Sequence, residues 1–535
     1  MCEKNAERQI EMKRFNVTGN CIPEENYMVD IGDKIAEIKK LIDDKYYFTI
    51  NRARQYGKTT TLGMLERTLK DEYAVASISF QGVSDGNFST EENFCESITR
   101  HISKALRFSS ADREYAEKWN NLSIADFDSL SEHITKMCEG KKVVLMIDEA
   151  DNASDNRIFV RFLNMLREKY IARRNGKDHT FQSVILAGVY DLKNMKLKMI
   201  KEGSYTPTET ETKLYNSPWN IAVDFEVDMS FCPAEIATML GEYDAEHSTG
   251  MDIAAISEEI YAYTSGYPFL VSRICQCIDE ELGKNWTSEG VREAVKILLA
   301  EKNTLFDDLF KNLENNKELH DFIYELLILG DFKPYMPYDP IVSIGERYGY
   351  FAKIGNGSAK VVISNKIFEL LMTDYYIVKD LRSKKQITGV FHTDVTKDGR
   401  FDMELCFRKF AEHYAEIYSK NDAEFLERHG RLIFLSYLKP LINGGGFWHI
   451  ESQLIDLRRM DIVVDYGREQ FIIELKLWKG KQYQKDAYEQ LLGYMETKRA
   501  NLGYLLTFDF RKGAKKDRKA EWVETNGKKI FEVIV

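Results

Sequence analysis

The sequence is poor in the features that mark membrane-bound, secreted and disordered proteins. No stretch approaches the ~18 consecutive apolar residues of a membrane-spanning helix, and Met1 to Phe15 is polar and charged, without an apolar signal core. Only 9 of the 535 residues are proline, and there is no low-complexity tract of the kind that forms a long disordered linker. These absences predict a soluble, cytoplasmic protein without a membrane partner.

Cysteine pairs and an excess of positive charge are also lacking. The 8 cysteines are scattered, none forms a CxxC pair, and Cys275 and Cys277 are too isolated to predict a zinc site. Reduced, mostly buried thiols are therefore expected. The net charge of −11 gives no general attraction to nucleic acid, so such binding must depend on local basic surface. With 44% hydrophobic and 30% charged residues, the chain has the composition and length of three or four globular domains.

A phosphate-binding motif follows the β-branched and aromatic run at 46–50. Gly57, Lys58 and Thr59 open a helix after a short loop. In that order, helix amides face a phosphate, the lysine reaches the β- and γ-phosphates, and the hydroxyl helps to hold Mg²⁺. The match to GxxxxGK[ST] is incomplete because Arg52 occupies the position of the first glycine. An ordinary strand-to-helix turn is the alternative interpretation.

A second stretch, from Lys142 to Asp151, supports a nucleotide site. It is a nearly continuous apolar run, typical of a strand buried on both faces, and it ends in two acids. At the carboxyl edge of a parallel sheet, Asp148 can support Mg²⁺ and Glu149 can polarise the water that attacks the γ-phosphate. A buried strand closed by a solvated acidic turn is the alternative. Together the two stretches predict ATP and Mg²⁺ as ligands.

The two stretches together resemble the AAA-ATPase-like family found in bacterial proteins. The shared pattern is Arg-x-Arg-x-Tyr-Gly-Lys-Thr over residues 52–59, without the first glycine, followed by an apolar strand that ends in Asp-Glu. The resemblance implies that Arg52 is the usual variation of this family, whose members often carry a C-terminal nuclease-like domain. The nucleotide-binding positions that it implies are Arg54, Tyr56, Gly57, Lys58, Thr59, Thr60 and Asp148.

Apolar strands separated by helices predict an α/β fold with a parallel sheet and right-handed crossovers. Five strands are expected, at 46–50, 74–80, 142–148, 183–189 and 220–225. Their order cannot be read from the residues, but the resemblance implies that strand 183–189 separates the strands leading to Lys58 and ending at Asp148. Tyr190 and Asp191 would then occupy the sensor position, and an ordinary strand-end turn is the alternative.

The residues at 233–302 are wholly helical in pattern and are expected to form the lid of such an ATPase. Within this stretch, Gly266-Tyr267-Pro268 resembles the GxP element of related switch-type ATPases, which implies that Pro268 lies near the nucleotide base. A turn with a helix cap explains the same glycine and proline equally well. Earlier in the chain, Met28-Val29-Asp30 resembles another family element that often lies near the base.

Residues 303–380 have the pattern of a winged helix. Three amphipathic segments precede two short strands that pair around Gly355-Asn-Gly357, a hairpin signal, and a helix at 366–376 follows. The third amphipathic segment has few basic residues, so we expect this module to brace the ATPase rather than to bind DNA.

A second chemical site is predicted on strands near the C-terminus. Glu474 and Lys476 fall on the same face of strand 470–477 because side chains alternate with a period of two. Asp461, at the start of the neighbouring strand 461–466, can reach that face across a hairpin. Two carboxylates can bind Mg²⁺ or Mn²⁺, and the ammonium group can orient or help to deprotonate the attacking water.

This pattern resembles the PD-(D/E)xK nuclease superfamily, with Asp461, Glu474 and Lys476 in its catalytic positions. Gln490 and Tyr494 share one face of the following helix and resemble the QxxxY element of an exonuclease-like branch. Solvated strand and helix surfaces are the alternative for both groups.

Two further features of this region have alternative interpretations. Arg458 stands where a glycine often precedes the Arg-x-Asp triplet, and an extra acidic ligand upstream is either Glu451 or Glu427. Basic residues gather over 479–519, which is compatible with phosphate-backbone contacts, although such runs are more often solvated loops.

These features predict an ATP-dependent protein with two modules. The expected domains are an N-terminal arm (1–27), a P-loop AAA-like ATPase core (28–232), a helical lid (233–302), a winged-helix-like domain (303–380), a linker (381–404) and a PD-(D/E)xK nuclease-like domain (405–535). ATP would act as a switch on a Mg²⁺-dependent nuclease, with DNA as the expected nucleic acid. The alternatives are a nucleotide-gated regulatory protein whose inactive nuclease fold grips DNA or a partner, and a signalling scaffold that forms homo-oligomers.

Overall fold

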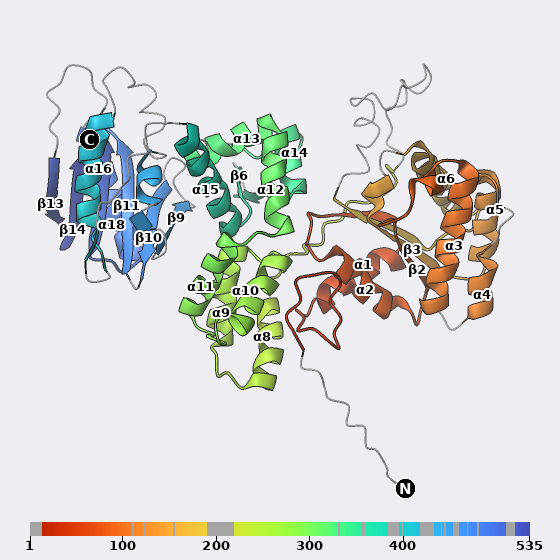
Figure 1. Ribbon diagram of the computed structural model, residues 1–535. Coiled ribbons are helices and arrows are strands. Elements are labelled where there is room, and N and C mark those ends of the chain that lie inside the picture. The colour runs from red at the N-terminus through yellow and green to blue at the C-terminus, as the bar shows by residue number, and fades with distance from the viewer. Residues whose placement is uncertain are drawn as a thin grey trace, which may run out of the picture. The chain divides into compact units, whose positions relative to one another are not determined.

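Two β-sheets organise the chain, one parallel and one mixed, and each has its own helices (Figure 1). The computed structural model describes residues 13–109, 112–120, 124–153, 156–189, 219–329, 332–355, 359–383, 395–397, 400–417, 433–439, 441–442, 446–452, 460–467, 469–478, 481–509 and 519–535. The chain divides into two units, residues 1–306 with 344–350 and residues 307–343 with 351–535. Across the described ranges, no helix combines the length and apolar composition needed to cross a membrane.

The sheet of the first unit has the order β1-β4-β3-β2, and all its neighbouring strands run parallel. The strands are β1 (Phe48–Asn51), β2 (Ala74–Ser79), β3 (Val143–Asp148) and β4 (Ser183–Gly188). Every residue of β3 and β4 is buried, as strands covered on both faces require. The observed order confirms that strand 183–189 separates the strands leading to Lys58 and ending at Asp148.

The prediction of a fifth strand at 220–225 is wrong. Within residues 219–229, all of which are described, pairing with the sheet is reduced to one parallel bridge between Phe48 and Val223. The reason is a turn at the start of this stretch, in which the Ala222 amide donates to the carbonyl oxygen of Trp219 (3.2 Å). The expected sensor residues, Tyr190 and Asp191, lie outside the described residues.

Helices cover both faces of the parallel sheet (Figure 1). On one side lie α1 (Gly32–Asp43) and α2 (Lys58–Leu69); on the other lie α3 (Glu91–Ser109), α4 (Arg113–Lys118), α5 (Phe127–Cys138) and α6 (Arg157–Arg174), with the short 3₁₀ turns η1 (Asp85–Phe88) and η2 (Ala150–Ala153). Side-chain caps from Asp126 and Asn156 begin α5 and α6. Aromatic rings such as Phe94 and Phe162, with centroids 5.1 Å apart, fill the core beneath these helices.

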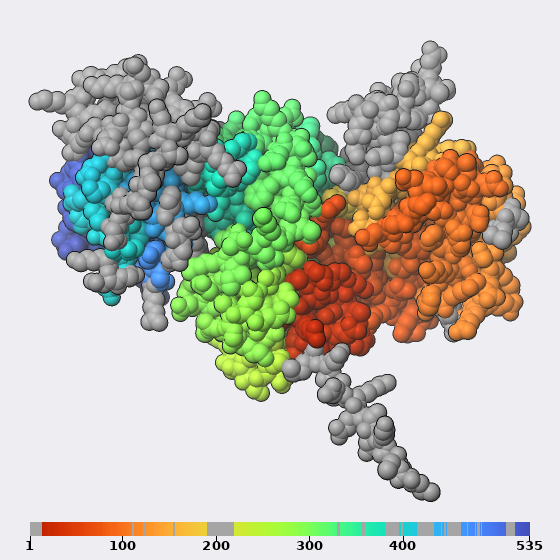
Figure 2. All heavy atoms as spheres, viewed as in Figure 1, coloured from red at the N-terminus to blue at the C-terminus, as the bar shows by residue number. Residues whose placement is uncertain are grey.

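After residue 218, the described part of the first unit continues with the helices α8 (Pro233–His247), α9 (Ile253–Thr264), α10 (Pro268–Glu280) and α11 (Ser288–Ala300). The N-terminal residues pack against them, and Figure 2 shows these residues (red) in contact with the yellow-green surface of the helices. The ring of Phe15 meets those of Tyr27, Tyr243 and Trp286, with centroids 5.0 to 5.9 Å apart. The N-terminal residues expected to form an arm therefore contribute, from Phe15 onward, to a buried aromatic cluster.

The second unit begins with helices and a hairpin. Its elements are α12 (Thr304–Asn315), α13 (Lys317–Tyr324), the π-helical turn η4 (Glu325–Leu329), α14 (Pro340–Arg347), β5 (Phe351–Ile354), β6 (Lys360–Ile363) and α15 (Lys366–Ser383). The start of α12 and the end of α14 belong to the first unit. Antiparallel pairing of β5 with β6 confirms the predicted hairpin, whose tip at 356–358 lies outside the described residues.

A six-stranded sheet of order β13-β14-β12-β11-β10-β9 completes the second unit. The strands are β9 (Gly446–Ser452), β10 (Met460–Tyr466), β11 (Glu469–Leu477), β12 (Leu502–Phe508), β13 (Lys519–Thr525) and β14 (Lys528–Ile534), preceded by the small hairpin of β7 (Thr396–Lys397) and β8 (Arg400–Phe401). One face packs under α18 (Lys481–Thr497), with Leu491 of the helix in one cluster with Ile472 and Leu505. On α16 (Met403–Ile417), Phe407 contacts Tyr504 of the opposite face.

Candidate functional site

The loop between β1 and α2 brings a buried lysine to the open end of a helix. Gly57 adopts a left-handed φ of 76°, and α2 begins at the next residue. Lys58 is 7% exposed, and its Nζ donates to the carbonyl oxygens of Arg52 (3.0 Å) and Ala53 (2.9 Å). Burial lowers the pKa of Lys58, while the charges of Glu149 and Asp148 oppose that shift. A positively charged ammonium group at a helix start with free backbone amides favours the binding of an anion such as phosphate.

A hydroxyl and a carboxylate meet beside this lysine. The Oγ1 atom of Thr59, at the start of α2, donates to Oδ2 of Asp148 at the end of β3 (2.7 Å). The other oxygen, Oδ1, accepts from the amide of Glu149 (2.9 Å). Hard oxygen donors of this kind are those that Mg²⁺ prefers, so the pair fits the expected cation.

Glu149 follows the strand in a strained conformation that turns the chain at the sheet edge. Its φ is +53°, in the left-handed region that non-glycine residues rarely adopt. Burial raises the pKa of its carboxyl group, and the negative charges of Asp151 and Asp148 raise it further, against the effect of Lys58. A carboxylate with a raised pKa is a better proton acceptor, which suits a group that polarises water.

Asp151 ties the ends of two neighbouring strands together. Its Oδ2 accepts from the amide of Val189, just after β4 (3.2 Å). Gly188 has no room for a side chain, because a Cβ there would lie 2.7 Å from Asp151 Oδ1. The sequence patterns predicted neither contact. Asp151, the third acid after the apolar run, was the available signal.

Arg52, the residue in place of the first motif glycine, has a structural role in the loop. Its guanidinium donates to the carbonyl oxygens of Asn51 (3.0 Å) and Val227 (2.9 Å) and lies 5.3 Å from the ring centre of Phe225. These contacts tie the loop to a segment far along the chain, which sequence patterns alone do not reveal.

The remaining predicted nucleotide-binding residues surround the same loop. Arg54 is exposed, and its carbonyl oxygen accepts from the Tyr267 hydroxyl (2.5 Å). The ring of Tyr56 meets that of Tyr267 edge-on at 4.6 Å, and burial raises the pKa of Tyr56 to about 12. Thr60 accepts at Oγ1 from the amide of Cys21 (3.2 Å).

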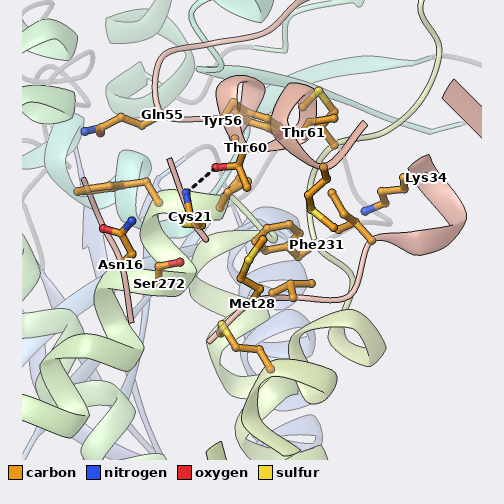
Figure 3. A pocket seen from close by; sticks show the side chains of 18 of the residues that line it. Asn16, Cys21, Met28, Lys34, Gln55, Tyr56, Thr60, Thr61, Phe231 and Ser272 are labelled. Carbon is orange, nitrogen blue, oxygen red and sulfur yellow. Dashed lines mark hydrogen bonds between the residues drawn. The ribbon is translucent and has the colours of Figure 1, made fainter. Parts of the chain in front are cut away.

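A largely apolar cavity of about 330 Å³ lies behind the start of α2 (Figure 3). Its lining includes Gly57 and Thr60 of the loop and helix, together with Pro268, Met28 and Phe231. A Cβ at Gly57 would lie 3.8 Å from Pro268 Cγ, so the proline is at the back of the phosphate loop. The N-terminal residues 16–19 and Cys21 also line this cavity, a contribution that the sequence did not predict.

In the second unit, three predicted residues form one connected group. Glu474 is almost fully buried on β11, and its Oε1 lies 2.5 Å from Nζ of Lys476. The same Nζ donates to Oε1 of Gln490 on α18 (2.9 Å). The acid and the lysine therefore share the sheet face beneath α18. Tyr494 is also buried on this helix, with Lys498 Nζ 5.8 Å from its ring centre.

Asp461 lies on β10, and its side chain is outside the described residues, as is that of Glu451. The backbone register pairs Ile462 with Ile473, so Asp461 is one residue further along, opposite the position of Glu474. On its other side, Asp461 pairs with Glu451 of β9. Glu427, the other candidate for an upstream acidic ligand, lies outside the described residues. Among described side chains, no three of His, Cys, Asp or Glu gather closely enough to hold a metal ion.

Sequence reasoning missed a second buried carboxylate on the same sheet. Glu532 of β14 is fully buried, and it accepts from Gln484 (2.7 Å), Tyr488 (2.9 Å) and Lys519 (3.3 Å). The register aligns Glu474, Leu505 and Glu532 across three strands. A lone glutamate within the apolar strand 530–535 was the available signal. Because three donors satisfy it, we interpret Glu532 as a structural anchor for α18.

Comparisons with known proteins assign a family to each of the two regions that carry these residues. The family described as "AAA-like domain" matches residues 34–320, more than half of the chain, and the "PD-(D/E)XK nuclease superfamily" matches residues 448–519. No curated protein matches the chain. The second match spans the strands and helix that carry Glu474, Lys476 and Gln490.

Three solved structures have similar folds, at low sequence identity. The Walker-type ATPase paby2304 of Pyrococcus abyssi is 13% identical over 67% of this chain and 99% of its own, with a TM-score of 0.46. The ORC2 protein of Aeropyrum pernix in its ADP form is 14% identical over 70% and 100%, with a TM-score of 0.35. The RuvB Holliday junction branch migration motor of Thermotoga maritima is 12% identical over 65% and 96%, with a TM-score of 0.32.

Proposed function

Because the chain belongs to the AAA-like domain family and carries a PD-(D/E)XK nuclease superfamily domain, we propose that it hydrolyses ATP in its first unit and cuts nucleic acid in its second. The observation that carries the first half is the 2.7 Å contact of Thr59 Oγ1 with Asp148 Oδ2, beside the buried ammonium of Lys58. The 2.5 Å contact of Glu474 with Lys476 supports the second half.

In the nucleotide site, each group has a role that follows from its chemistry. The amides at the start of α2 and the ammonium of Lys58 bind the β- and γ-phosphates. Arg54, exposed on the loop, adds a further positive charge. Glu149 accepts a hydrogen bond from the attacking water and orients it. Thr59 and Asp148 would hold Mg²⁺, which neutralises charge on the phosphate oxygens when bound.

The apolar cavity is the proposed pocket for the nucleotide base. Its wall behind Gly57 is formed by Pro268, and Met28 and Phe231 supply further apolar surface. Transfer of a flat aromatic base from water to such an apolar surface is energetically favourable. The position of the cavity behind the phosphate loop supports the base-binding roles expected for Pro268 and for residues 28–30.

In the nuclease site, Asp461 and Glu474 would hold a divalent cation, Mg²⁺ or Mn²⁺, which activates water when bound. Lys476 orients that water and takes up or donates a proton. Gln490 holds the ammonium of Lys476 through its Oε1. Tyr494, one helical turn further along α18, is proposed to act from the same helix face. The pairing of Asp461 with Glu451 favours Glu451 as the additional acidic ligand.

We also propose the domain division expected from the sequence. Residues 28–232 form the ATPase core, 233–302 the lid and 405–535 the nuclease domain, joined through a linker at 381–404. Residues 303–380, with their helices and one hairpin, are proposed to be a winged helix that braces the ATPase. DNA is the proposed substrate, and ATP the ligand that switches cutting on.

ATP turnover by the purified chain tests the first half of this proposal. Lys58→Ala should lower turnover by about 100-fold or more, because the ammonium is lost from the phosphates. Glu149→Gln should keep ATP bound but unhydrolysed, since the amide cannot accept a proton. Lys70→Ala, which changes an exposed lysine just after the same helix, is the matched control and should leave turnover unchanged. Wild-type turnover in both Lys58→Ala and Glu149→Gln would contradict the proposal.

A further inference from the structure

Two segments outside the phosphate loop pack against its residues Ala53 and Arg54. From the start of α10, the Tyr267 hydroxyl donates to the Arg54 carbonyl oxygen. From the segment 344–350, Gly349 lies so close that a Cβ there would be 2.9 Å from Ala53 Cβ and 3.5 Å from Tyr267 Cε2. Ala53 and Tyr267 are both buried. The loop is therefore packed tightly against both segments at this point.

The same part of the loop also accepts hydrogen bonds from Lys58. Nζ of Lys58 donates to the carbonyl oxygens of Arg52 and Ala53. An ammonium group has three N–H donors. Contact with both a β- and a γ-phosphate uses two of them, so at least one of the two carbonyl bonds must be exchanged when Lys58 binds ATP. Phosphate binding therefore changes the hydrogen bonding of the pair Arg52 and Ala53, and Gly349 packs against Ala53.

Segment 344–350 is a well-ordered helix end rather than a loose loop. The Gly349 amide donates to the Glu346 carbonyl oxygen (2.9 Å) and the Tyr350 amide to that of Gly345 (2.8 Å). With a φ of +73° at Gly349, these two bonds form a Schellman cap at the end of α14. The two bonds tie Gly349 and Tyr350 to the last turn of α14.

The segment is covalently continuous with the second unit on both sides. Residues 307–343 and 351–535 belong to that unit, whereas 344–350 pack within the first. The end of α14 is thus in the first unit and its beginning in the second, and β5 starts directly after Tyr350. The peptide backbone therefore connects Gly349 directly to these neighbours.

Taking the proposed ATP binding as its premise, we propose that Tyr267 and Gly349 are positioning residues of the phosphate loop, and that Gly349 couples nucleotide binding to residues 340–343 and 351–354 of the second unit. Tyr267 sets the loop through a hydrogen bond, and Gly349 through the absence of a side chain. The consequence is a path by which ATP regulates the part of the chain that carries the nuclease domain.

Affinity for a slowly hydrolysed ATP analogue with Mg²⁺, measured by calorimetry on the full chain, tests the positioning roles. Gly349→Ala pushes on Ala53, and Tyr267→Phe removes only a hydroxyl, so each should weaken binding by about fivefold or more. Ala53→Gly should partly restore the affinity of Gly349→Ala by making room for the new Cβ. Rescue by this second change would not follow from a general loss of stability.

The matched controls carry the same chemical changes away from the loop. Gly250 has a φ of +69°, and among the described residues none but its two chain neighbours has an atom within 4 Å of the point where its Cβ would be, so Gly250→Ala reproduces the backbone strain without the contact. Tyr243→Phe removes a buried hydroxyl that donates to Asp279. Both controls should keep the wild-type affinity within about twofold.

Hydrogen exchange of the backbone amides tests the coupling. In the wild type, exchange over residues 348–354 should slow when the analogue binds, and in Gly349→Ala this difference should disappear. If the wild type does not bind the analogue, the proposed function fails and the coupling fails with it. If the wild type binds but exchange at 348–354 does not respond, or both variants bind as tightly as the wild type, ATP binding stands and this inference is overturned. Should Gly349→Ala fail to fold, Tyr267→Phe and the wild-type exchange still decide the question.

Discussion

At the scale of single residues, both candidate sites depend on a lysine held by oxygen atoms. Lys58 donates to two carbonyl groups of the phosphate loop, and Lys476 bridges Glu474 and Gln490. A buried ammonium is costly unless such partners surround it, so its position is well defined. In each candidate site acids accompany the lysine, and opposite charges of this kind are what the proposed binding of a metal ion and a phosphate requires.

Gln490 gives a residue-scale test of the nuclease site. Gln490→Ala removes the amide oxygen that holds Lys476, so we expect DNA cutting to fall by about 10- to 100-fold. Gln482→Ala on the same helix is the matched control, because Gln482 is exposed and bonds only to Asp486 among the contacts described for its side chain. Initial rates of DNA nicking measure both variants. Equal, undiminished rates in the two would show that Gln490 does not position the lysine.

At the scale of secondary-structure elements, an ion pair between a buried lysine and a partly buried aspartate joins α6 to α5 and to the turn before β4. Lys169 is 3% exposed, and its Nζ bonds to Asp178 (2.7 Å), Thr135 (2.7 Å) and the Ser131 carbonyl oxygen (2.9 Å). Because neither charge reaches solvent freely, loss of one partner leaves the other uncompensated. This pair is therefore more important for stability than the surface pairs of the same unit.

Asp178→Asn should accordingly destabilise the first unit by about 3–5 kcal/mol. Urea unfolding of the full chain, followed by tryptophan fluorescence, measures the change. Glu114→Gln, which breaks the exposed pair of Glu114 with Lys118, serves as the control and should leave the midpoint unchanged. A midpoint for Asp178→Asn equal to that of the control would refute the stabilising role of the pair.

The same carboxylate should make stability depend on pH in acid. Burial favours its neutral form, but the bonds from Lys169 and Thr135 prevail and hold the pKa of Asp178 below its usual value. A carboxyl group with a lower pKa in the folded state stabilises that state above its unfolded pKa of about 3.9. This stability is lost as the pH falls through the folded value. Unfolding midpoints at decreasing pH, below about 5, should therefore drop more steeply in the wild type than in Asp178→Asn.

How far the sequence predicts these elements depends on whether the signal is local. The alternation that put Glu474 and Lys476 on one strand face, and the spacing of Gln490 on the next helix, lie within short windows and agree with the observed contacts. By contrast, the Arg52 bond to Val227 joins residues far apart in the chain, and no periodicity reports it. The stretch 220–225 looked like a strand because it is apolar, but the turn at its start limits it to one bridge.

At the scale of the whole molecule, two units carry two separate candidate sites. The first matches an ATPase family over 34–320, and the second a nuclease superfamily over 448–519. The net charge of −11 means that DNA contact must rely on local positive charge rather than on the whole surface. The central claim is that this one chain has both a nucleotide site and a working cutting site.

The rate at which the full chain nicks supercoiled DNA, with Mg²⁺ and ATP present, tests this claim most directly. Asp461→Asn should abolish nicking while ATP turnover continues, because only a cation ligand of the second site is lost. Asp465→Asn, on the same strand at a residue bonded to Gln470, is the control and should keep both activities. We predict nicking by the wild type and the control but not by Asp461→Asn. Nicking by Asp461→Asn at the wild-type rate, or no nicking by the wild type, would contradict the account.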